Sequence, residues 1–138
     1  MRNLLLYIIP VFVFLSCENK KFDSARLNDA SLFHSAMQNL SDIIVYDIFS
    51  PPVASRVYLY PSIAAYELMA RDMPLKYKSL VGQVKDLTQI PEPERDFKNY
   101  NLNLTILYAF NKVGKTLIFS DELMDNFEKR FTNKLNSI

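Results

Sequence analysis

The chain has 138 residues, of which 49% are apolar and 13% aromatic, so it can bury the core of one domain and is not expected to be disordered. Its 16 Lys and Arg residues nearly balance 15 Asp and Glu residues, which leaves a formal net charge of +1. This balance gives no electrostatic basis for binding nucleic acid.

Residues 1–17, "MRNLLLYIIPVFVFLSC", have the pattern of an export signal. Arg2 supplies a positive charge, and an apolar run follows over residues 4–15. As a helix this run would rise only about 18 Å, which is shorter than a hydrocarbon core of about 30 Å. The segment is therefore predicted to direct export and not to span the membrane.

Cys17 is the only cysteine and stands directly after the apolar run and Ser16. This arrangement resembles a bacterial lipoprotein signal, which implies lipidation of Cys17, a lipid anchor as the membrane contact, and a place in the cell envelope of a Gram-negative bacterium. The alternative is a general secretory signal with an incidental cysteine. A single cysteine excludes internal disulfides. Residues 18–28 are polar and aperiodic and are predicted to form a tether.

Helical periodicity begins at Asp29, and a first helix is predicted to end near Phe49. Ser50 is then expected to cap a second helix, whose first turn tolerates Pro51 and Pro52 because those positions need no N–H donor. The second helix, residues 52–71, carries few charges and is predicted to lie in the middle of a bundle. Pro61 within it predicts a kink or a brief break.

Residues 75–87 are expected to form two or three helical turns weakened at Gly82, and a loop follows over residues 88–101. A helical period returns over residues 102–117. Ser120 is expected to cap a last helix. Its apolar stripe comprises Leu123, Phe127, Phe131 and Leu135. No strand alternation occurs, so the prediction is an all-α domain over residues 29–138 with four to five helices.

Candidate chemical groups are few, and no catalytic, cofactor-binding or metal-ligating residue is predicted. His34 is the only histidine and is expected at the surface. The "AFNKVGKT" stretch ends like a phosphate-binding loop, but no strand precedes it and it lies within a helical pattern. Arg56 and Glu67 share a helix face and are candidates for burial with separate partners. Asp47 is within reach of Arg56, and a structural ion pair between them is expected in preference to a ligand site.

Three stretches carry a family resemblance: "SDIIVYDIFSPPVASRVYLYPSIAAYE", "YKSLVGQVKDLTQIPEPE" and "VGKTLIFSDE". They resemble the N-terminal region of vanadium-dependent haloperoxidase-like lipoproteins of the type-2 phosphatidic acid phosphatase superfamily. The resemblance extends over residues 42–131, and its most specific part is the "DIFSPPVASR" corner. It implies an early scaffold segment that packs around a catalytic helical bundle.

The resemblance also implies vanadate in complete family members, with peroxide-dependent halide oxidation or phosphomonoester hydrolysis as the reaction. Such members bind the oxyanion through a Lys, an Arg-Pro pair, a Pro-Ser-Gly-His run and a later Arg and His. None of these motifs is present here; after Pro61 and Ser62 the chain continues with Ile63 and Ala64. The chain alone is therefore predicted to be inactive and to hold no cofactor.

Two interpretations follow from the resemblance and the missing motifs. In the first, the chain is the front part of a haloperoxidase-like protein, truncated or split, whose apolar stripe on the last helix is exposed and binds a missing C-terminal half or another copy. In the second, it is a small helical envelope lipoprotein that acts as an interaction module and binds a partner or a glycan through exposed tyrosines.

Overall fold

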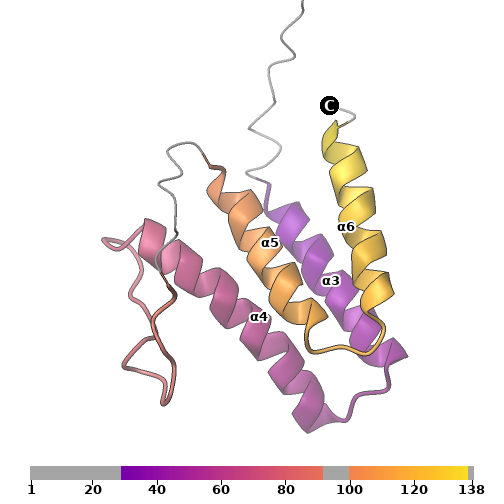
Figure 1. Ribbon diagram of the computed structural model, residues 1–138, viewed down its shortest axis with the longest axis horizontal. Coiled ribbons are helices and arrows are strands. Elements are labelled where there is room, and N and C mark those ends of the chain that lie inside the picture. Colours follow the sequence, from indigo (N-terminus) through magenta and orange to yellow (C-terminus); the bar gives the residue numbers. More distant parts are fainter. Residues whose placement is uncertain (1–28, 92–99, 137–138) are drawn as a thin grey trace, which may run out of the picture.

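The structure is a computed structural model that describes residues 29–91 and 100–136. Within these ranges the chain forms the helices α3 (Ala30–Tyr46), α4 (Pro51–Asp72), α5 (Leu102–Lys115) and α6 (Asp121–Asn136), and no named strand. The predicted all-α class is confirmed. Figure 1 shows α5 between α4 and α3, with α6 on the far side of the bundle. None of these helices is both long and apolar enough to cross a bilayer.

The helix α3 ends in a Schellman motif. The N–H of Phe49 donates to the carbonyl of Ile44, and the N–H of Ile48 donates to that of Val45, each at 3.2 Å. Ile48 occupies the position after the C-cap, where glycine is usual, with φ of 54°. The main chain reverses there because a left-handed residue turns the last carbonyls back toward following N–H groups.

The predicted proline corner is confirmed. Pro51 and Pro52 occupy the first two positions of α4, and Ser50 is extended at the N-cap with ψ of 152°. The expectation that the Ser50 side chain caps the helix is wrong, because it makes no capping hydrogen bond. The fixed φ of the prolines suits a helix start without that bond.

The helix α4 is uninterrupted from Pro51 to Asp72, so the expected break at Pro61 is absent. Pro61 is buried and donates no N–H, while the neighbouring Ser62 hydroxyl donates to the Tyr58 carbonyl at 2.7 Å. The predicted central position of α4 is also wrong. It packs mainly on α5 at one side of the bundle (Figure 1), and its outer face leaves large apolar side chains exposed: Val53, Leu59 and Tyr60.

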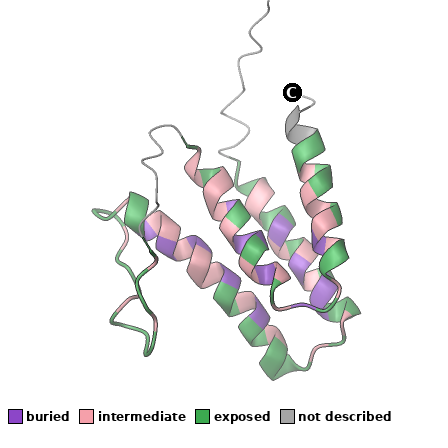
Figure 2. Cartoon of the chain, in the orientation of Figure 1, coloured by how far each residue is buried: buried purple, intermediate pink, exposed green. Residues whose placement is uncertain are grey.

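The core lies where α3, α5 and α6 meet α4. Its largest fully buried side chains are Leu40, Ile43, Pro61, Phe110 and Met124, one or more from each helix. Figure 2 shows the buried positions on the facing sides of the helices. Gly114 of α5 lies at the centre, where an added Cβ would lie 3.4 Å from Met124 Cε and 3.6 Å from Leu40 Cδ1.

The apolar stripe of α6 is not exposed, which corrects the prediction. Leu123, Phe127 and Phe131 are half-buried and pack against the core, and the Phe127 and Phe131 rings stack with centroids 6.5 Å apart. The Leu135 side chain lies outside the part of the chain that the structure describes. Helix α6 therefore buries its stripe within this chain because it folds back antiparallel to α3 (Figure 1).

Residues 73–91 form turns and irregular backbone, so the two or three helical turns expected there do not form. Gly82 has φ of 80° and Asp86 has φ of 63°, both left-handed and incompatible with a continuing α-helix. The left-handed turns at Gly82 and Asp86 therefore prevent the helix that the spacing of apolar residues predicted in this segment.

Candidate functional site

The residues singled out for chemistry are scattered over the fold. His34 is exposed on α3. Cys17, the predicted lipidation site, lies outside the described residues. Within residues 29–91 and 100–136, no three His, Cys, Asp or Glu side chains cluster closely enough to hold a metal ion.

Glu67 is buried, as its helix face predicted, but its partners come from the irregular segment that follows α4. Its two carboxylate oxygens accept hydrogen bonds from the Ser79 hydroxyl and the Leu80 N–H, each at 2.6 Å. The Tyr66 hydroxyl donates to the Lys78 carbonyl at 2.9 Å. Together these bonds fix residues 78–80 against the helix, which gives the Glu67 carboxylate a structural role.

The predicted ion pair between Asp47 and Arg56 is wrong. Arg56 is exposed. Asp47, its expected partner, contacts the residues at the start of α6 instead. The Asp47 carboxylate accepts hydrogen bonds from the Phe119 N–H at 2.8 Å, the Ser120 N–H at 3.2 Å and the Ser120 hydroxyl at 2.6 Å. It thereby satisfies N–H groups at a helix end that carries positive partial charge.

The same contacts determine the protonation of Asp47. Burial by itself would raise its pKa, but the hydrogen bonds from the Ser120 hydroxyl and from the Phe119 and Ser120 N–H groups together outweigh burial. The pKa of Asp47 is therefore held below its usual value. The carboxylate remains ionised at neutral pH and acts as a cap for α6.

The Gly-Lys-Thr sequence of residues 114–116 is placed at the end of α5. Gly114 and Lys115 are helical and Thr116 is the C-cap, so the backbone N–H groups are engaged within the helix and cannot surround a phosphate. Lys115 forms ion pairs with Asp125 and Asp121 of α6, and the hydrogen bond to Asp125 raises the pKa of Lys115. This cation ties α5 to α6.

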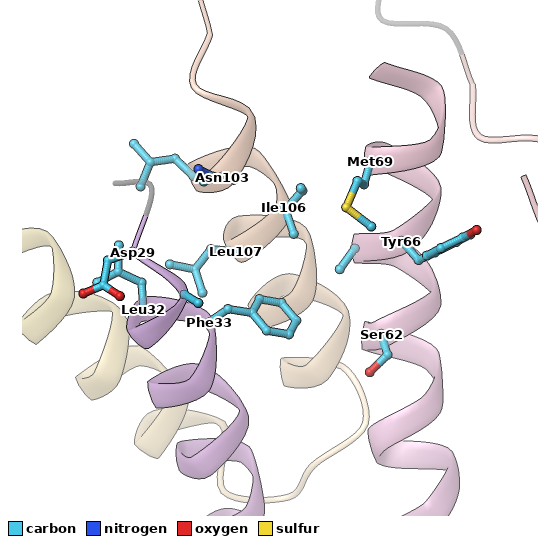
Figure 3. Close-up of a pocket in the computed structure, with 12 residues that line it drawn as sticks. Asp29, Leu32, Phe33, Ser62, Tyr66, Met69, Asn103, Ile106 and Leu107 are labelled. Carbon is cyan, nitrogen blue, oxygen red and sulfur yellow. The ribbon is translucent and has the colours of Figure 1, made fainter. Parts of the chain in front are cut away.

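An apolar pocket of about 440 Å³ lies between the first half of α3, the second half of α4 and the first half of α5 (Figure 3). Its wall is formed mainly by large apolar side chains: Leu32, Phe33, Met69, Ile106 and Leu107. Phe33 also packs edge-on against Phe110, with the ring centroids 5.0 Å apart. The pocket was not predicted, because helix periodicity gives the apolar faces and not the spacing between helices.

Polar groups contribute little to this pocket. Ser62 donates to its own helix, and the Tyr66 ring turns its hydroxyl away from the pocket toward Lys78 (Figure 3). Asp29 accepts from the Ser31 N–H and hydroxyl at the start of α3. The pocket therefore suits an apolar side chain or segment.

The helical arrangement of this chain is similar to that of a solved protein. A solved bacterial vanadium-dependent iodoperoxidase is similar to this chain, with 38% sequence identity and a TM-score of 0.66 over 73% of this chain. The described helices have a haloperoxidase-like fold. No protein-family model matches the chain, and no curated protein matches it.

The haloperoxidase-like match extends over only 24% of the iodoperoxidase chain. The helices described here thus correspond to a minor part of that protein. In the described part of this chain the donor set does not fit a vanadate centre, because the pocket wall is apolar, His34 stands alone at the surface, and Lys115 is paired with carboxylates.

Proposed function

We propose that this chain is a scaffold segment of a haloperoxidase-like assembly, which packs against a catalytic helical bundle that supplies the oxyanion-binding residues. The observation that carries the proposal is the 38% identity between this chain and a limited part of an iodoperoxidase. This chain has the haloperoxidase-like fold but lacks the oxyanion-binding motifs of the family. Conversion of peroxide and halide, or of a phosphate ester, would then belong to the complete assembly.

The exposed face of α4 supports this role. Between Val53 and Ala70 only Arg56 and Glu67 are charged, yet the helix lies at one side of the described bundle, where residues 79–90 of this chain cover only its second half. Val53, Leu59 and Tyr60 retain 38%, 52% and 46% of their accessible surface. A nearly uncharged helix at an edge is typical of a surface that another element covers.

A chimaera tests the proposal. The aligned part of this chain replaces the matching 24% of the bacterial iodoperoxidase, and folding, vanadate binding and iodide oxidation are measured. The expected result is a folded chimaera that binds vanadate and oxidises iodide, while the 138-residue chain alone does neither. Two results together would contradict the proposal: the chimaera does not fold, and the isolated 138-residue chain is a compact monomer that binds no hydrophobic dye.

The second candidate is an envelope interaction module that binds a partner or glycan. A cleft of about 600 Å³ between α3 and α6 favours it, since Tyr46 is 68% exposed there beside amide and charged groups: Asn39, Asp42, Asn126, Lys129 and Arg130. Such a mixture of a ring and hydrogen-bonding groups suits a sugar. Binding of the isolated chain to a glycan array, lost in Tyr46→Ala, would favour this function.

Placement in the cell envelope through lipidated Cys17 is part of both candidates. It rests on the apolar run of residues 4–15 followed by Ser16 and Cys17. A chain with three acyl groups, as lipoproteins of this type carry, would exceed the two signals that stable anchoring requires.

A further inference from the structure

A groove between α5 and α6 combines an apolar floor with an incompletely paired polar group. It has a volume of about 260 Å³, and Leu104, Leu107 and Phe131 provide its apolar surface. Tyr108, which is 61% exposed, stands at its edge. The groove lies on a different part of the bundle from the exposed face of α4.

Asn111 of α5 lines this groove and is 3% exposed. Its side-chain oxygen Oδ1 is buried and has no hydrogen-bond partner within the described residues. A buried amide oxygen without a donor costs about 1–3 kcal/mol. Natural proteins retain such a group where a ligand, a water molecule or another element supplies the donor.

The charge of the groove indicates what kind of donor is expected. Glu128 of α6 is its only charged lining residue. It lies within electrostatic reach of Lys115, but no salt bridge joins Glu128 to a cation within residues 29–91 and 100–136. Hydroxyls of Tyr108 and Thr132 complete the polar lining. An acceptor and a carboxylate beside apolar surface are complementary to a basic donor on an apolar element.

We propose that this groove binds an apolar helix that carries one Arg or Lys side chain, which pairs with Glu128 and, once the Asn111 amide turns toward the groove, donates to Asn111 Oδ1. The inference rests on the proposed scaffold function, in that the helix belongs to the part of a haloperoxidase-like assembly outside this segment. The apolar residues of the helix cover Leu104, Leu107 and Phe131, and the basic group neutralises the only charge of the groove.

The test compares Asn111→Leu in the isolated chain and in the iodoperoxidase chimaera, with Gln38→Leu on the exposed side of α3 as the matched amide control. In the isolated chain the substitution removes an unpaired acceptor, so Tm should stay the same or rise. In the chimaera it removes a paired one, so Tm should fall by at least about 2 °C. Glu128→Gln should lower Tm in the chimaera alone, and Gln38→Leu should change the Tm of neither protein.

Each other outcome overturns the inference. A fall of Tm in both proteins would show that Asn111 supports this chain itself, and no fall in either would show that the groove holds water only. A chimaera that fails to fold with Asn111 intact, together with an isolated chain that is a compact monomer without hydrophobic-dye binding, would instead reject the scaffold function.

In that last case a peptide decides the inference directly. A synthetic amphipathic helix of leucine and alanine with one central arginine is titrated into the 138-residue chain, and the backbone amide resonances of the groove residues Leu107, Glu128 and Thr132 are followed. Binding should shift these resonances and should weaken at least about tenfold with Asn111→Leu or with methionine in place of the arginine. The inference would be overturned if three combinations bound equally well: the original chain with the arginine peptide, Asn111→Leu with the arginine peptide, and the original chain with the methionine peptide.

Discussion

The carboxylate of Asp47, at the end of α3, accepts hydrogen bonds from both the hydroxyl and the backbone N–H of Ser120, at the start of α6. At the same junction the centroids of the Phe49 and Phe119 rings lie 5.0 Å apart. One side chain thus joins the corner between α3 and α4 to the turn between α5 and α6. The cap is supplied by a residue distant in sequence.

Replacement of Asp47 by Ala should lower the free energy of unfolding by about 1–2 kcal/mol at neutral pH, because the N–H groups before α6 lose their acceptor. Thermal or urea unfolding of the two proteins measures this. Asp42→Ala is the control, since the exposed Asp42 accepts only from Gln38 on its own helix, and it should cost under about 0.5 kcal/mol.

The cost of Asp47→Ala should also depend on pH. Because the pKa of Asp47 is lower in the folded chain than its usual value, its stabilisation is fully present above about pH 4 and is lost as the pH falls through the folded-state pKa. The difference between the two proteins should therefore shrink as the pH is lowered below about 4. A difference that stays constant over that range would show that the charge of Asp47 does not contribute.

The contrast between Asp47 and the helices shows what the sequence could reveal. Spacing of apolar residues and the Pro51–Pro52 pair predicted all the helices described, because these signals act within one or two turns. The partners of Asp47 and Glu67 could not be predicted, since each lies on another element. The edge position of α4 was missed for a related reason: low charge shows that a helix is covered, but not whether its own chain covers it.

Glu67→Ala should destabilise the chain by about 1–3 kcal/mol, because it leaves the Leu80 N–H and the Ser79 hydroxyl without their acceptor. Amide hydrogen exchange at Leu80 should become faster at the same time. Arg56→Ala on the same helix is the control and should cost under about 0.5 kcal/mol, since Arg56 is exposed. Equal costs for the two substitutions would contradict the assignment of partners.

Gly114→Ala should keep or raise the stability, by up to about 1 kcal/mol, because Ala favours a helix over Gly. The new Cβ would meet Met124, Leu40 and Pro61 at 3.4, 3.6 and 3.7 Å, which are ordinary contact distances. Gly114→Val adds two more methyl groups and should cost about 1–3 kcal/mol. Calorimetry distinguishes the pair, and a large loss with Ala would show that the four helices meet more tightly than these distances indicate.

Cys17→Ser should abolish acylation if the cysteine is the lipidation site. Radiolabelled palmitate should enter the original protein, and the variant should carry no label and move from the membrane to the soluble fraction. Ser16→Ala serves as the control, because it retains the thiol and a small preceding residue. Label that persists in Cys17→Ser would leave a general secretory signal as the explanation for residues 1–17.

Ile48→Gly should stabilise the isolated chain, although it removes a large apolar side chain. Ile48 lies after the C-cap of α3 with φ of 54°, a conformation that costs a residue other than glycine about 1–2 kcal/mol. Its side chain is 88% exposed, so little burial is lost. The greater flexibility of glycine in the unfolded chain offsets part of the relief, and the expected net gain is about 0.5–1 kcal/mol.

Unfolding measurements on Ile48→Gly, Ile48→Asn and Val45→Gly test this explanation. Asn also tolerates the left-handed conformation and should stabilise the chain, whereas Val45 is helical and 77% exposed, so glycine there should cost about 0.5–1 kcal/mol. A loss of stability in both Ile48 variants would mean that the side chain contributes to stability despite its exposure. A gain would show that a strained isoleucine is retained at the surface for a reason other than the stability of this chain, as expected of a surface that another element covers.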